Sequence, residues 1–348
     1  MTQVIGAPTL FDALSILSER VRRNEEKQIR NLIFCEDRLT LLCERAVLDA
    51  VGGSFLSEVT TFARYLSGSA RVLSKQGSVI KLSELIDVYA DELSCFRRGA
   101  AQAVYETIAQ LSASCVNAEM LRESALSTDG ILKKKLSDLA FLLEKYVLFL
   151  KENELVDENG YLGLLPEKIA GEGANLYRTE IFFFGFPSFT KQAQEGVRAA
   201  IENASVTGIF VAGKRERFYT NESAGVFKRI AEEYGEVSAR QMKSSLAGDA
   251  LILNERLFSA ESYRLGQEPA SQVCAFSAED EGREAETVAA LIKKYVIEEN
   301  GRYRDCVVLV PDCSAFPVMA HAFDNFKIPY FADEKRPFSE HPFCVFVL

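Results

Sequence analysis

The apolar run with the sharpest boundary lies near the middle of the chain, where residues 181–184 are followed by Gly-Phe-Pro-Ser. A continuous apolar run of this length is typical of a strand that is buried on both faces in a parallel sheet. The glycine and proline predict that this strand ends abruptly at its carboxyl end, and open α/β sheets bind ligands at that edge. A buried strand followed by an ordinary turn, with no ligand, is the alternative that the local sequence leaves open.

Strand-to-helix units are predicted three times within the first 66 residues. Each has a short apolar or β-branched run followed by apolar residues at helical spacing. The second helix is expected to bury the face that carries Leu41, Leu42, Ala46 and Leu48, and a glycine pair ends it. The expected elements are residues 2–6, 9–23, 31–35, 37–51 and 57–66. Repeated units of this kind favour a parallel, doubly wound sheet.

Between about residues 82 and 165 the pattern changes to long amphipathic helices with almost no strand signal. Strand signals return at 179–184 and 206–212, and a second α/β unit is expected from residue 272, with strands at 306–310 and 328–331. We therefore predict an α/β protein with three parts. These are a parallel-sheet domain (1–78 and 170–265), an all-helical insertion (79–169) and the start of a second α/β domain (266–348).

Composition adds limits to this picture. The chain has 348 residues, 48 % of them hydrophobic and 26 % charged, and a net charge of −10. No apolar run approaches the roughly 20 residues that span a bilayer, and the amino terminus lacks the pattern of a signal peptide. We expect a cytoplasmic protein with no membrane contact. The eight cysteines form no Cys-x-x-Cys pair, which argues against disulfides and metal clusters.

The negative net charge means that any nucleic-acid contact must rest on local basic patches. The candidates are Arg20/Arg22/Arg23, Arg97/Arg98, Lys133 to Lys135, and Lys214/Arg215/Arg217. Each of them is also compatible with an ordinary solvated face.

The turn after strand 2–6 is where a phosphate-binding loop G-x-x-x-x-G-K-[ST] would lie. Counting from Gly6, the positions of the second glycine, the lysine and the hydroxyl residue hold Phe11, Asp12 and Ala13. A phenylalanine would obstruct the backbone amides, and an aspartate would place negative charge where phosphates need positive charge.

The apolar strand 181–184 lacks the carboxylates of a nucleotide motor. Such a strand would end in Asp-Glu, one carboxylate to hold magnesium and one to activate water, whereas this chain has Phe184 and Gly185. No nucleophile and base set can be assembled around His321 and His341, the only histidines. We expect no catalytic residue, no metal and no nucleotide hydrolysis in this chain.

The order of elements resembles the first half of a UvrD-like superfamily 1 helicase. More closely, it resembles the AddB family, whose members are the B subunits of bacterial ATP-dependent helicase/deoxyribonucleases. Several segments carry the resemblance, which extends over essentially the whole chain. They are Phe34 to Asp37 with Thr40 and Glu44, Thr61 to Tyr65, Phe184 to Thr190, and the signature from Ile328 to Pro342. The chain departs from the family at Phe184, in the phosphate loop, and at Pro311, which replaces an arginine.

The resemblance implies RecA-like α/β domains and a role on DNA. Its single-stranded DNA face would match Thr40, Thr60, Thr61, Phe62, Arg64, Phe186 and Phe189, with Asp37 where the family has an amide. The same phenylalanines could instead be core residues. The resemblance also implies an AddA-type partner subunit that uses ATP and magnesium, and contact with single- and double-stranded DNA. The family's iron–sulfur cluster and nuclease metal belong to a region beyond residue 348, and the apolar ending of the chain suggests a fragment.

Two other functions stay open. The chain could be a working ATP-dependent helicase fragment, against which Phe11, Asp12, Phe184 and Gly185 argue. It could also be a protein–protein scaffold that has lost its DNA contact.

Overall fold

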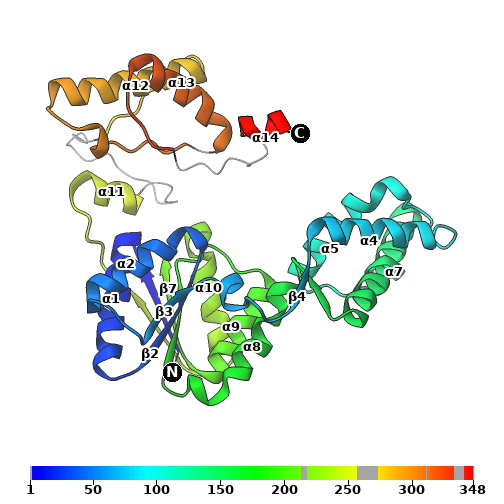
Figure 1. The fold of residues 1–348 in the computed structure, drawn as a ribbon. Helices are drawn as coiled ribbons and strands as arrows, with labels where there is room; N and C mark the ends of the chain where they lie inside the picture. Colours follow the sequence, from blue (N-terminus) through cyan, green and yellow to red (C-terminus); the bar gives the residue numbers. More distant parts are fainter. Residues whose placement is uncertain (1, 213–217, 257–272, 311, 333–340, 348) are drawn as a thin grey trace. The chain divides into compact units, whose positions relative to one another are not determined.

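The computed structural model describes residues 2–347 except 213–217, 257–272, 311 and 333–340 (Figure 1). The chain divides into two compact units, residues 1–265 and 266–348. No helix in the described part of the chain is long and apolar enough to cross a membrane.

The first unit is built on a six-stranded sheet in which every pair of neighbouring strands is parallel. The strand order is β3-β2-β6-β7-β1-β8. The strands are β1 (Thr2–Ala7), β2 (Arg30–Cys35), β3 (Ser57–Thr60), β6 (Thr179–Phe184), β7 (Ser205–Val211) and β8 (Val237–Gln241). Every residue of β6 is buried, as expected for a central strand covered on both faces. This is the RecA-like α/β fold that the apolar patterning and the family resemblance predict.

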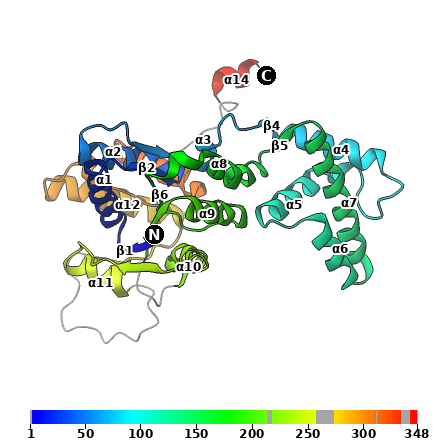
Figure 2. The same cartoon turned by 90° about the horizontal axis from the view of Figure 1, so that it is seen from below.

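Helices cover both faces of this sheet (Figure 2). One core cluster joins α1 and α2 to side chains such as Phe182 and Phe184. The other joins α8, α9 and α10 to side chains of the opposite face, such as Phe183 and Phe210. The bounds are α1 (Leu10–Glu26), α2 (Thr40–Val51), α8 (Leu165–Glu172), α9 (Lys191–Asn203) and α10 (Phe218–Glu232).

Helix α2 buries a different face from the one predicted. Its buried residues are Thr40, Cys43 and Val47, whereas Leu41 and Leu48 are each 55 % exposed. The helix has apolar residues around most of its circumference, so spacing alone allows more than one inward face. Packing against α1 and the sheet selects the face with the smaller side chains.

The insertion begins and ends in a short parallel strand pair, β4 (Arg71–Leu73) and β5 (Leu155–Asp157). Between them lie four helices that bury their own apolar core. They are α4 (Lys75–Val88), α5 (Ala101–Ala113), α6 (Ala118–Leu126) and α7 (Gly130–Glu152). The buried Asp138 accepts backbone N–H bonds from Ser94 and Cys95, at 3.1 and 2.6 Å, and so fixes the turn after α4. Between residues 82 and 165 the regular secondary structure is helical apart from strand β5.

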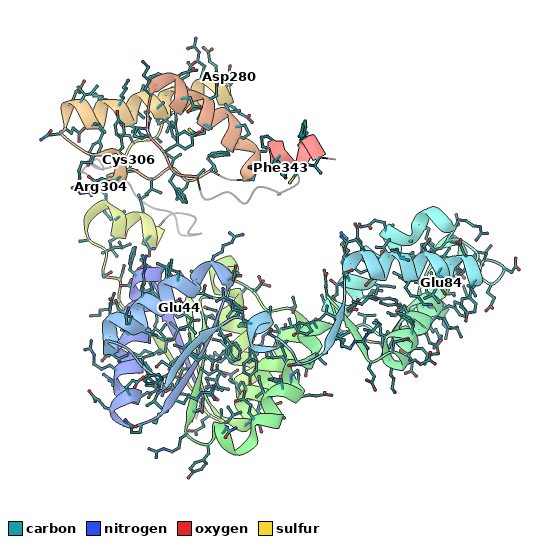
Figure 3. The ribbon with its side chains drawn as sticks, in the orientation of Figure 1. Glu44, Glu84, Asp280, Arg304, Cys306 and Phe343 are labelled. Atoms are coloured by element: carbon teal, nitrogen blue, oxygen red, sulfur yellow. The ribbon has the colours of Figure 1, made fainter. Side chains whose placement is uncertain are left out.

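The second unit contains three α-helices among its described residues: α12 (Glu281–Glu298), α13 (Phe316–Phe326) and α14 (Pro342–Val347). Helices α12 and α13 pack on each other through a small core that includes Ala289 and Phe323. Arg304 and Cys306 follow α12, and Phe343 lies in α14 (Figure 3).

The strands predicted at 306–310 and 328–331, and one expected from residue 272, are not formed in the described residues of this unit. Burial nevertheless alternates along the first segment. Val308 packs on the helices, whereas Val307 and Leu309 are 81 % and 91 % exposed. A strand requires a neighbour that takes up its N–H and C=O groups. No described segment of the unit pairs with these residues.

Candidate nucleic-acid interface at the carboxyl edge of the sheet

The loops after β3, β2 and β6 lie next to one another because these three strands are neighbours and run parallel. Phe34 pairs with Thr60, and Cys35 pairs with Phe184, so the three strands end at the same level. Most of the residues predicted to contact DNA lie on these loops. The structure therefore brings them together at one edge of the sheet.

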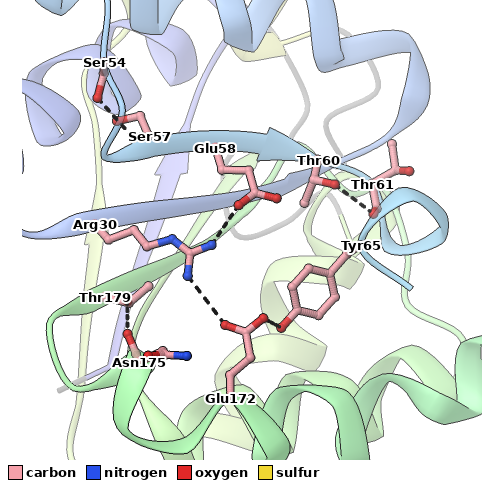
Figure 4. Close-up of polar contacts among 10 residues, drawn as sticks. All are labelled: Arg30, Ser54, Ser57, Glu58, Thr60, Thr61, Tyr65, Glu172, Asn175 and Thr179. Atoms are coloured by element: carbon pink, nitrogen blue, oxygen red, sulfur yellow. Dashed lines mark hydrogen bonds and ion pairs between the residues drawn. The ribbon is translucent and has the colours of Figure 1, made fainter. Parts of the chain in front are cut away.

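The loop after β3 leads at once into the one-turn helix α3 (Phe62–Tyr65). Thr61 is its N-cap, because the Thr61 hydroxyl accepts a hydrogen bond from the Arg64 backbone N–H at 3.2 Å. Thr60 donates its hydroxyl to the Thr61 carbonyl at 3.3 Å (Figure 4). Both threonines are buried. Their hydroxyls hold the backbone that presents Phe62 and Arg64.

Arg64 projects from this tip and lies beside Asp37 on the neighbouring loop. Its Nη2 atom is 3.3 Å from Asp37 Oδ1, and the two side chains are 55 % and 65 % exposed. Asp37 begins a 3-10 turn, Asp37–Leu39, that follows β2. The buried Thr40 donates its hydroxyl to the Asp37 carbonyl at 2.9 Å. Thr40 therefore supports the turn from within.

The three predicted aromatic contacts differ in their exposure. Phe62 is half-buried and stacks on Phe186, with ring centroids 5.0 Å apart. Phe186 and Phe189 are each only 8 % exposed and belong to the core cluster around Phe183. Of the three rings, Phe62 is the one that a base can reach without rearrangement of the core.

A polar network that the sequence did not predict supports α3 from the side of the sheet (Figure 4). The Tyr65 hydroxyl donates to Glu172 on α8 at 2.6 Å. Arg30 reaches Glu172 at 3.5 Å and Glu58 at 2.7 Å. Burial, and then the bond to the Glu172 carboxylate, raise the pKa of Tyr65 above its usual value. Tyr65 and Glu172 lie 107 positions apart, so no local pattern could have linked them.

Other residues of the same chain occupy the space beyond the carboxyl end of β1. Only Pro8 and Thr9 separate β1 from α1, which is too short for a loop that wraps around phosphate. The Asp12 carboxylate accepts hydrogen bonds from the Thr9 hydroxyl at 2.8 Å and from the Ser245 N–H at 3.2 Å. Burial pushes the pKa of Asp12 up, but these bonds outweigh it and hold the pKa below its usual value. Phe11 is 80 % exposed.

The two glycines of the predicted nucleotide position are both closely approached by other side chains. A Cβ at Gly6 would lie 2.1 Å from the Gln241 side chain of β8. Gly185 has φ +70°, and a Cβ there would lie 2.6 Å from Leu39. Phe184 is fully buried. Helix α11 (Gly248–Arg256) adds a further contact to this edge, since Asn254 donates to the Pro8 carbonyl at 3.3 Å.

Comparison with known proteins identifies the family to which this chain is similar. A family model described as the N-terminal region of ADDB matches residues 58–265. The chain belongs to the AddB family. This match covers residues 58–60 of β3 and the whole of α3 and β6, the elements that position Arg64, Phe62 and Phe186.

Relatives of this AddB chain are named as the B subunit of an ATP-dependent helicase/deoxyribonuclease. The Clostridium novyi protein is 24 % identical over 95 % of this chain and 32 % of its own length. The Listeria welshimeri protein is 24 % identical over 99 % of the chain and 32 % of its length. The Geobacillus thermodenitrificans protein is 26 % identical over 93 % and 31 %. The AddB chain thus spans about a third of the length of these relatives.

The predicted basic patches of the AddB chain differ in whether their side chains already form ion pairs or hydrogen bonds within the protein. Arg20 is paired with the buried Glu180 at 3.2 Å and is structural. Arg23 pairs with Glu19, and Arg97 donates to the Leu93 carbonyl. The lysines 133–135 are exposed on the first turns of α7. Lys214, Arg215 and Arg217, and residues 333–340 of the signature segment, lie outside the described residues.

Proposed function

We propose that this chain is a non-catalytic, helicase-like part of an AddB-type subunit that binds single-stranded DNA at the carboxyl edge of β3, β2 and β6. One observation carries the proposal: a capped one-turn helix presents the exposed cation of Arg64 next to the accessible ring of Phe62. Arginine binds phosphate, and an aromatic ring stacks on any base. Together they suit a strand that is held without strict sequence preference.

The residues at the carboxyl ends of β1 and β6 support a role without ATP hydrolysis. Phosphoryl transfer depends on fixed positive charge and magnesium carboxylates around the phosphates. Here Asp12 places a carboxylate at the amino end of α1, and a buried phenylalanine and a crowded glycine end β6. In this proposal an AddA-type partner subunit supplies ATP hydrolysis and unwinding. The complex acts in double-strand break repair and recombination, where single-stranded DNA is formed from a duplex.

The DNA proposal is tested by titrating labelled oligo-dT against the chain together with its partner subunit, at low and moderate salt. Arg64→Ala is expected to weaken binding and to reduce the slope of log affinity against log salt by about 0.7, the value for one phosphate contact on a single strand. Arg122→Ala is the matched control. Arg122 is 51 % exposed and also pairs with a carboxylate, that of Glu144, but it lies in the insertion.

No binding of the wild-type chain at either salt concentration would instead leave a protein–protein scaffold as the better description. Equal affinity of wild type and Arg64→Ala would show that the DNA face lies elsewhere. A labelled ATP analogue is expected not to bind the isolated chain at micromolar concentrations, and binding there would contradict the non-catalytic role.

A further inference from the structure

The ion pair between Asp37 and Arg64 joins two side chains whose backbones are both fixed. Asp37 is held by the Thr40 hydroxyl, which donates to its carbonyl. Arg64 is held by its N–H bond to Thr61, and the next residue, Tyr65, is anchored on Glu172. The 3.3 Å contact between the charged groups therefore follows from the arrangement of the two loops.

The positive charge of Arg64 is offset by negative charge in the same part of the edge. Asp37 and Glu44 carry negative charge and Arg64 carries positive charge, and all three lie close enough to the Cys35 thiol to influence its pKa. A DNA phosphate that approaches Arg64 therefore meets a guanidinium that is already paired with the Asp37 carboxylate.

A carboxylate and a phosphate use the same N–H groups of arginine. They cannot both take the full fork of one guanidinium. An exposed ion pair of this kind is weak, so a phosphate can displace the carboxylate. The displaced Asp37 then remains near the phosphate, where like charges repel.

We propose that Asp37 is an internal competitor for phosphate at Arg64, so that a DNA phosphate takes the full guanidinium fork only by displacing the carboxylate and leaves it again quickly. This inference rests on the proposed function, since it concerns the same DNA face. A contact that is easily lost suits a subunit along which a strand moves, because tight binding at one phosphate would hold the strand in place.

The test is Asp37→Asn in the full chain with its partner subunit, measured by oligo-dT titration and by dissociation kinetics. Loss of the competing charge is expected to raise affinity about three- to tenfold, mainly through slower dissociation. Glu144→Gln is the matched control, because it removes the same charge from an exposed ion pair with Arg122. The control is expected to leave affinity within about 1.5-fold of wild type.

A second variant separates competition from general repulsion. In an Arg64→Ala background, Asp37→Asn is expected to give a clearly smaller gain, because only the direct repulsion between Asp37 and phosphate is then removed. An equal gain with and without Arg64 would overturn the proposal, and so would unchanged or weaker binding by Asp37→Asn alone. If the wild type binds oligo-dT and Arg64→Ala weakens that binding, the proposed DNA face stands even when the proposal about Asp37 fails. If neither the wild type nor Asp37→Asn binds, the proposed function fails together with this inference.

Discussion

The ring of Phe62 lies nearly parallel to the ring of Phe186, with centroids 5.0 Å apart and an interplanar angle of 13°. Phe186 in turn contacts Phe183 and Phe189, at 6.4 and 5.2 Å between centroids. The half-buried ring at the tip of β3 is thus continuous with a buried aromatic cluster. The core positions Phe62, whereas Phe186 is part of the core.

This relationship predicts different consequences for the two phenylalanines. Phe186→Ala is expected to lower the free energy of unfolding by about 3–5 kcal/mol, because it leaves a cavity among buried rings. Phe62→Ala is expected to cost less stability but to weaken oligo-dT binding by about 1–3 kcal/mol, the range for one stacked base. Urea unfolding followed by circular dichroism, together with DNA titration, separates the two effects. An unchanged stability of Phe186→Ala would contradict the core assignment.

Replacing Phe184 by Asp and Gly185 by Glu is expected not to create an ATPase. The first change buries a carboxylate in a fully apolar site. The second places a side chain at φ +70° against Leu39. The double variant is expected to lose at least about 4 kcal/mol of stability and to show no ATP hydrolysis.

If the double variant fails to fold, two single glycine substitutions still test whether Gly185 is constrained. Gly185→Ala is expected to cost about 1–3 kcal/mol, whereas Gly171→Ala in α8 has open space around its Cβ and is expected to be neutral or slightly stabilising. Thermal unfolding of the two compares them directly. Equal melting temperatures would show that Gly185 is not constrained.

The buried carboxylate of Glu180 is expected to be a major determinant of stability at the amino end of the sheet. It accepts hydrogen bonds from Thr207 at 2.5 Å, Asn24 at 2.7 Å and Arg20 at 3.2 Å. Glu180→Ala is expected to destabilise the protein by about 3–5 kcal/mol, because its partners are left unsatisfied. In a double-mutant cycle with Arg20→Ala, the combined loss should be smaller than the sum of the single losses. Additive losses would mean that the two residues act independently.

The pKa of Asp12 gives an expected pH dependence. Because this pKa is lower in the folded protein than the ordinary value of 3.8, ionised Asp12 stabilises the fold at pH values above 3.8. That contribution is lost as the pH falls through the folded pKa. The stability difference between the wild type and Asp12→Asn should therefore be largest near neutral pH and shrink below pH 3.8. A difference that stays constant from pH 7 to about pH 3 would exclude this linkage.

The apolar pattern was sufficient for the elements that are buried on both sides. The runs at 31–35 and 181–184 predict β2 and β6, since a strand that is buried on both faces requires these residue types. Strand β8 was missed, because it is a polar edge strand that pairs only with β1 and keeps most of its residues exposed. Its register depends on a neighbour more than 230 residues away in sequence, which no local pattern can supply.

The residue types of the candidate site could be predicted from the sequence, but the hydrogen bonds that its polar side chains form could not. Parallel strand ends account for the proximity of Arg64 and Asp37. Nothing in the sequence indicates that the Thr40 hydroxyl donates to the Asp37 carbonyl, or that the Thr61 hydroxyl accepts a hydrogen bond from the Arg64 N–H. Such roles depend on where a turn begins, to within one residue, and that is the least certain feature of a sequence pattern.

The strand pair β4 and β5 brings together two parts of the chain that are 84 residues apart, Arg71 and Leu155. The insertion therefore departs and returns through neighbouring segments, and the order of β3, β2 and β6 does not depend on what lies between them. In terms of protein engineering, the four helices form a module. Because β4 and β5 run parallel, a crossover linker of about a dozen residues from Leu73 to Leu155 should allow the helices to be removed or exchanged while the sheet keeps its topology.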